Sequence, residues 1–110
     1  MAEKWESFVD NLKDTTGVLA KSELKTLVSV AKTDSDEFIK KQGVKLERYL
    51  NQLALGQITP EQFKSYIEDL HKLTEMQSLK MHVAAKASAQ RLCKGIEDMI
   101  LNILMRLLPS

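Results

Sequence analysis

The chain has 110 residues, with 16 Lys and Arg against 15 Asp and Glu, a formal net charge of +1 and a single cysteine. This length suits one domain, the balanced charge gives no general attraction to nucleic acid or to an anionic membrane, and one cysteine excludes an internal disulfide and fits a reducing compartment. Because the start MAEKWESFVDNLKD lacks the apolar core of a signal peptide and no apolar run approaches the roughly 20 residues that cross a bilayer, we expect a cytoplasmic protein that does not span a membrane.

Helices are expected throughout the chain. It holds only 4 Gly and 2 Pro, and its β-branched residues are scattered, so the punctuation of a sheet protein is missing. In the first segment, apolar residues recur mostly at steps of three, four and seven, which is typical of one buried helix face. This spacing predicts a helix from about Ala2 to Lys32. The stretch from Thr15 to Gly17 disfavours a helix interior, and a kink or break would fall there.

A second helix is expected from about residue 35 to residue 55. Asp34 or Ser35 is placed to cap its start, because a short polar side chain there accepts hydrogen bonds from the amides of the next turn. Gly56 is placed to end the helix in the left-handed backbone conformation that glycine adopts without strain.

The clearest local signal starts a third helix at Pro60. Thr59 is the expected N-cap, Pro60 takes the first helical position, and Gln62 completes a capping box. No further proline occurs before Pro109 and the apolar spacing continues. One helix over about residues 60–108 is therefore predicted, roughly 73 Å long.

The expected architecture is an all-α, three-helix elongated bundle with a very long C-terminal helix. It forms one domain over residues 1–110, with the first two helices in residues 1–58 and the third helix, including an oligomerisation segment, in residues 59–110. The alternative is a third helix that kinks or breaks near Ser78 or Gly95 and folds back to give a compact monomer.

The C-terminal end of the expected long helix lacks cover from its own chain. The second helix is antiparallel to the third and reaches only to about Lys80, yet nine of the thirteen positions from Ile96 to Leu108 are apolar. A helix that is apolar nearly all round is typically buried, and a second copy of the chain is the simplest cover, giving a dimer or a higher homo-oligomer. A different protein is the alternative, and lipid is least favoured because the tail has no basic face. The expected oligomer interface consists of Ala85, Leu92, Ile96, Met99, Ile100, Ile103, Leu104 and Leu107.

A basic cluster lies between Gln77 and Gly95, where no acidic residue occurs. Such a cluster binds phosphates in nucleic-acid-binding proteins, but this one has no aromatic residue for stacking and belongs to no recognition-helix motif. Nucleic acid is therefore the less favoured partner. The candidate anion or nucleic-acid patch consists of Lys80, Lys86, Arg91 and Lys94.

Catalytic and metal-binding patterns are weak. Glu68 and His71 have the Glu-x-x-His spacing of di-iron bundles, but such a site needs a second copy of the motif, which the chain lacks. Cys93 has no histidine near it in sequence and is expected to be a small buried side chain. We expect no enzyme activity, no cofactor and no metal. The predicted function is a helical assembly or interaction module that oligomerises through its C-terminal helix, and the alternative is a nucleic-acid-associated helical protein.

Overall fold

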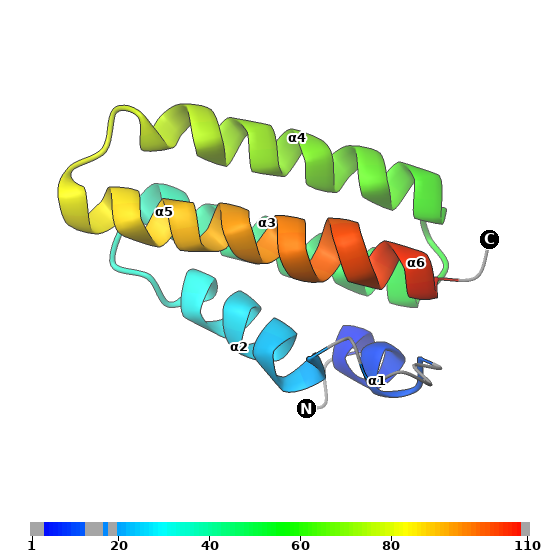
Figure 1. The fold of residues 1–110 in the computed structure, drawn as a ribbon. Helices are drawn as coiled ribbons and strands as arrows, with labels where there is room; N and C mark the ends of the chain where they lie inside the picture. The colour runs from blue at the N-terminus through cyan, green and yellow to red at the C-terminus, as the bar shows by residue number, and fades with distance from the viewer. Residues whose placement is uncertain (1–3, 13–16, 18–19, 109–110) are drawn as a thin grey trace.

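Every regular element in the described part of the chain is helical. The computed structural model describes residues 4–12, 17 and 20–108, and within these ranges it contains no strand, which confirms the expected all-α class. None of the helices there combines the length and the apolar character that crossing a bilayer demands. The elements in chain order are α1 (Lys4–Asp10), α2 (Lys21–Lys32), α3 (Glu37–Ala54), α4 (Pro60–Ser78), α5 (Val83–Gly95), the π-helix η1 (Ile96–Leu104) and α6 (Met105–Leu107) (Figure 1).

The expected first helix, from about Ala2 to Lys32, is wrong as a single element, because α1 and α2 are separate. Gly17 has a φ of +66°, a left-handed conformation that an α-helix cannot contain. Ala2 and the two threonines before Gly17 lie outside the described residues. The ammonium group of Lys21 donates to the carbonyl oxygen of Asp10 at 3.0 Å, so α2 satisfies the end of α1.

The boundaries of α3 agree closely with the sequence. Asp36 is the N-cap, one position after Ser35, and its side chain accepts from the backbone N–H of Ile39 at 3.1 Å. Asp34 instead accepts from the N–H of Asp36 at 2.8 Å and shapes the turn that leads into the helix. Gly56 follows the helix with a φ of +72°, which confirms its expected role as terminator.

The start of α4 is confirmed in detail. The Thr59 hydroxyl accepts from the backbone N–H of Gln62 at 3.1 Å, and the Gln62 side chain accepts from the N–H of Thr59 at 2.9 Å. Both halves of the capping box are therefore present, with Pro60 at the first helical position.

The expected continuous helix over residues 60–108 is wrong, since α4 ends at Ser78 and the chain reverses before α5. The N–H groups of Leu79, Lys80 and Met81 bind carbonyl oxygens three residues back, which tightens the last turn. The break falls near Ser78, as in the folded-back alternative, while Gly95 lies inside an uninterrupted helical run. Folding back is favoured because it packs the apolar tail against the rest of the chain, whereas a straight helix leaves it in water.

The helices pack around one core, with α3 and α5 between α4 on one side and α2 on the other (Figure 1). The molecule measures 40 × 27 × 24 Å and its radius of gyration is 13.5 Å, so the expected elongated bundle is replaced by a shape close to that of an ordinary compact domain. The largest fully buried apolar side chains are Trp5, Val9, Leu24, Ile39, Leu46, Leu50, Phe63, Ile67, Ile96, Ile100 and Leu104.

Two interior contacts hold α3 against its neighbours. A Cβ at Gly43 would lie only 2.7 Å from the backbone carbonyl carbon of Ala31, so α2 and α3 approach as closely as glycine permits. On the α4 side, the buried Gln42 amide donates to the Thr74 hydroxyl at 2.8 Å and to the Leu70 carbonyl oxygen at 3.3 Å. These bonds satisfy a polar side chain that is 1% exposed.

The π-helix η1 keeps the apolar tail on the core. Leu92, Ile96, Ile100 and Leu104 are spaced by four residues, and all are buried. In an α-helix, a step of four residues turns about 40° beyond a full circle, so a long row at this spacing drifts off one face. The wider turns of a π-helix reduce the rotation per residue and offset this drift.

Candidate interaction surface

The structure places the expected oligomer interface largely inside the protein's own core. Leu92, Ile96, Ile100 and Leu104 are at most 2% exposed within a single chain. Met99, Ile103 and Leu107 are half-buried and pack against the same core, and Ala85 is half-buried on α5. The premise that the tail lacks cover from its own chain is therefore wrong, because the reversal after α4 supplies that cover. The four buried residues present no surface to a partner of the folded chain.

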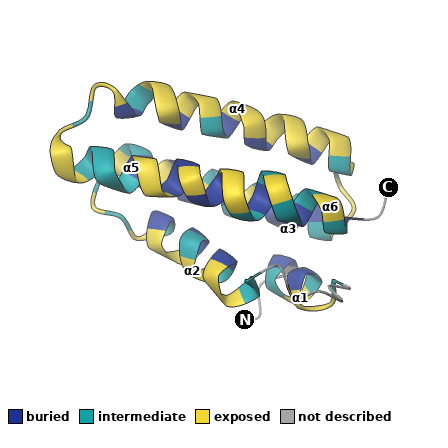
Figure 2. Cartoon of the chain, in the orientation of Figure 1, coloured by how far each residue is buried: buried dark blue, intermediate teal, exposed yellow. Residues whose placement is uncertain are grey.

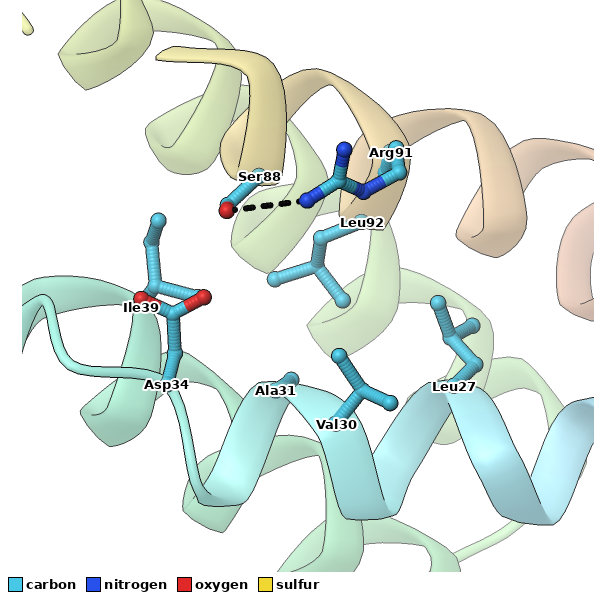
Figure 3. Close-up of a pocket in the computed structure, with 8 residues that line it drawn as sticks. All are labelled: Leu27, Val30, Ala31, Asp34, Ile39, Ser88, Arg91 and Leu92. Atoms are coloured by element: carbon cyan, nitrogen blue, oxygen red, sulfur yellow. Dashed lines mark hydrogen bonds between the residues drawn. The ribbon is translucent and has the colours of Figure 1, made fainter. Parts of the chain in front are cut away.

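A small groove lies between α2 and α5, near the turn that joins α2 to α3. Figure 3 shows Leu27 and Val30 pointing from α2 toward Leu92, which points down from α5. Asp34 lies at the rim, and the Arg91 guanidinium donates to the Ser88 hydroxyl at 3.2 Å. The cavity is about 30 Å³, which is room for a couple of water molecules and not for a metabolite.

A more open hollow adjoins this groove at the start of α5. Its volume is about 360 Å³, and its lining includes His82, Ala85 and the acidic pair Asp34 and Asp36. Among the residues that the structure describes, no group of three or more His, Cys, Asp and Glu side chains is arranged to hold a metal ion. The hollow therefore offers polar contacts without a constellation that identifies a ligand.

The basic residues of the candidate nucleic-acid patch are dispersed. At about 100° per residue, Lys86 and Arg91 fall on opposite flanks of α5, and Arg91 faces the groove with α2. Lys94 lies 3.4 Å from the Asp98 carboxylate one turn later. Lys80 is exposed in the turn after α4. A partner with one continuous line of phosphates would not meet all four charges together.

Cys93 on α5 lies beside His71 on α4, but its environment does not favour nucleophilic chemistry. The Cys93 thiol donates to the His71 carbonyl oxygen at 3.8 Å. Burial, followed by the negative charges of Glu75 and Glu97, raises the pKa of Cys93 from 9.0 to about 11, so the thiol is protonated at neutral pH. The expectation that Cys93 is a buried side chain is confirmed.

His71 faces η1 and is not paired with Glu68. Its Nε2 atom lies 3.0 Å from a Glu97 carboxylate oxygen, without the alignment of a hydrogen bond, so the attraction depends on protonation of the ring. Glu68 is exposed on α4. The Glu-x-x-His pattern therefore does not bring two ligands to one place.

The exposed apolar side chains gather along α4, the turn after it and the first residue of α5. Of the eight large apolar residues that are exposed in the described chain, five lie between residues 66 and 83, which makes this stretch the richest apolar surface. Leu79 and Val83 are the most exposed of all, at 75% and 86%. Figure 2 shows exposed residues along most of α4. We call this set the α4 row: Tyr66, Leu73, Met76, Leu79 and Val83.

The α4 row adjoins an exposed part of α3. The rings of Tyr49 and Tyr66 lie 5.2 Å apart between centroids, and Lys45 and Asp69 line the shallow cavity beside them, about 120 Å³ in volume. Leu73 lines the same cavity. The row is thus continuous with a surface that offers tyrosine rings, a residue type enriched in protein interfaces, with charged groups beside them.

Sequence reasoning missed the α4 row. Its signal is present in the spacing of Tyr66, Asp69, Leu73 and Met76, which recur at steps of three and four on a face different from that of Phe63, Ile67 and Leu70. The two faces can be told apart only when it is known which of them meets the core. No protein-family model, no curated protein and no solved structure matches this chain.

Proposed function

We propose that this protein is a non-enzymatic helical interaction module and that the α4 row is its contact surface. The observation that carries the proposal is the concentration of exposed apolar side chains between residues 66 and 83, in a chain whose other large apolar residues are mostly buried. Burying an apolar side chain of this size is worth about 1.5–3 kcal/mol, so a partner that covers Leu73, Met76 and Leu79 gains a substantial driving force.

The fold itself does not require these side chains. Phe63, Ile67 and Thr74 are buried and hold α4 on the core. Met76 lies on the far side of the helix from them, and Leu73 lies on the flank beside the cavity toward α3. Exposed apolar residues that contribute little to the core are better explained by a contact than by stability. This separation distinguishes the α4 row from the C-terminal tail, whose apolar residues are already covered.

The features that would support an enzyme are weaker. The groove between α2 and α5 is too small for a substrate, and the Cys93 thiol is held in its protonated form. The dispersed basic residues give a nucleic-acid function less support than the apolar row gives a protein contact.

Site-specific photo-crosslinking in cells that produce the full chain tests the proposal. A photoreactive amino acid at Leu73 should give discrete adducts on a denaturing gel, because this position lies within the contact surface. The same amino acid at Glu23, an exposed position on α2, is the matched control and should give none. If position 73 gives no adduct, or gives the same pattern as position 23, the proposal is wrong.

A further inference from the structure

We infer that the partner of the α4 row is a second copy of this chain, packed antiparallel so that α4 lies against α4 of the partner about a two-fold axis. The inference rests on the proposed function and names its partner. It is drawn from the order of four exposed residues on one side of α4 and the turn after it: Asp69, Leu73, Met76 and Lys80.

These four residues follow the spacing of a helix–helix seam. They recur at steps of four, three and four, so they lie along one side of an α-helix. Lys80 comes after the last residue of α4, but the N–H of Leu79 and the N–H of Lys80 bind the carbonyl oxygens of Met76 and Gln77, so the backbone keeps winding to this point. The seam therefore reaches from Asp69 to Lys80.

The order of the four residues is complementary to its own reversal. In chain order the four residues are acidic, apolar, apolar and basic. A two-fold axis between Leu73 and Met76 makes the partner's seam run in the opposite direction. Asp69 then meets the partner's Lys80, and Leu73 meets the partner's Met76. A two-fold interface requires this property, because each contact between two positions must occur twice with the roles exchanged.

The charges at the two ends favour this partner. Asp69 and Lys80 are exposed, and in the described ranges neither side chain forms an ion pair within its own chain. An antiparallel dimer pairs both charges of both copies, whereas a parallel dimer sets Asp69 against Asp69 and Lys80 against Lys80. Charge complementarity of this kind selects partner and orientation.

The contact is small, so the dimer is in equilibrium with the monomer. The surface consists of one exposed helix side and the neighbouring part of α3, with Lys45 and Tyr49. The area that it can bury is at the low end of the range for specific interfaces. We expect a dissociation constant of the order of micromolar.

Charge reversal tests the inference on the purified full chain, with sedimentation or light scattering measured across concentration. The wild type should dimerise, and Asp69→Lys and Lys80→Glu should each weaken dimerisation about tenfold or more, because each reversal places like charges in both end contacts. An equimolar mixture of the two variants should recover wild-type association, since every end contact is again between opposite charges. The double variant should recover it as well.

Glu68→Lys is the matched control. It changes the net charge as Asp69→Lys does, and Glu68 is exposed on α4 at a position outside the seam. It should dimerise like the wild type. Circular dichroism of each variant should show an unchanged helical fold, because all the substituted residues are exposed.

Three results would overturn the inference. The first is a wild type that stays monomeric at high concentration. The second is single charge-reversal variants that associate like the wild type, as expected of a parallel dimer. The third is an equimolar mixture of the two variants that does not recover association. A crosslinked adduct at position 73 with a mass other than that of two chains, together with a monomeric wild type, would leave the proposed function standing and exclude the second copy as its partner.

Discussion

The two arms of the C-terminal hairpin, α4 and the run of α5, η1 and α6, come from one stretch without internal proline but have opposite relations to water. The second arm is the more apolar in sequence, and its residues Ile96, Ile100 and Leu104 are fully buried. The first arm has an ordinary amphipathic composition, yet it carries Leu73 and Met76 on its exposed side. Apolar content alone therefore does not locate an interface. What matters is which face the remainder of the chain has covered.

The largest test of this difference is truncation of one apolar side chain on each arm. Ile100→Ala removes a side chain that is 0% exposed, and it should lower the free energy of unfolding by about 2–5 kcal/mol. Leu73→Ala removes a side chain that is 38% exposed, and it should lower the stability of the monomer by no more than about 1 kcal/mol. Urea denaturation at low protein concentration measures both. Equal losses would contradict the difference in burial between the two arms.

The reactivity of Cys93 reports whether the two arms stay packed together. Because burial raises its pKa to about 11, the folded chain holds about a hundredfold less thiolate at pH 8 than an unfolded chain with the ordinary value of 9.0. Labelling by a thiol reagent should therefore be at least about a hundredfold slower in the folded protein than in urea. Comparable rates in the two states would show that the arms open readily.

A smaller effect is expected at the buried polar contact that holds α4 on α3. Thr74→Val keeps the shape of the side chain but removes the nearer of the two acceptors of the Gln42 amide, and we expect a loss of about 1–2 kcal/mol. Thr26→Val is the matched control, because the Thr26 hydroxyl also donates to a carbonyl oxygen four residues back but lies exposed on α2. Thermal unfolding that moves equally in both variants would contradict the assigned role of Gln42.

The smallest effects concern the starts of the two arms. Thr59→Ala removes the capping box of α4 and should cost about 1 kcal/mol. His82→Ala should cost less than about 0.5 kcal/mol, because the His82 side chain makes no capping hydrogen bond at the start of α5. Chemical denaturation of the two variants compares them directly. A costly change at His82 would indicate a capping role that the present geometry lacks.

The sequence predicts elements well where a local interaction determines them. The capping box of Thr59 and Gln62 and the left-handed Gly56 involve neighbours within a few residues, and both were expected correctly. The chain reversal from Leu79 to His82 contains no proline or glycine from which a turn could be predicted. It is favoured by the burial in one core of residues far apart in the chain, such as Ile67 and Ile100. Local patterns do not report such contacts.

The exposure of the apolar tail depends on the same long-range contacts. The tail was expected to lack cover from its own chain, and so to need a second copy, because a straight helix would carry it beyond its neighbours. Once the chain reverses, Ile96 and Leu104 are covered, and Leu73 and Met76 are what remains outside. The spacing of α4 contained the necessary residues, but their exposure depends on the topology.

The π-helix η1 also affects how the chain tolerates changes in length. Each of its wider turns contains more residues than a turn of an α-helix, so the segment could lose a residue and still complete its turns. Deleting one residue between positions 97 and 103 would let the segment narrow toward α-helical turns while Leu108 keeps its place against the core. Deleting one residue from the middle of α4 would instead rotate everything after it by about 100° and turn Thr74 away from Gln42. We therefore expect natural variation in chain length to concentrate in η1 and to be absent from α4.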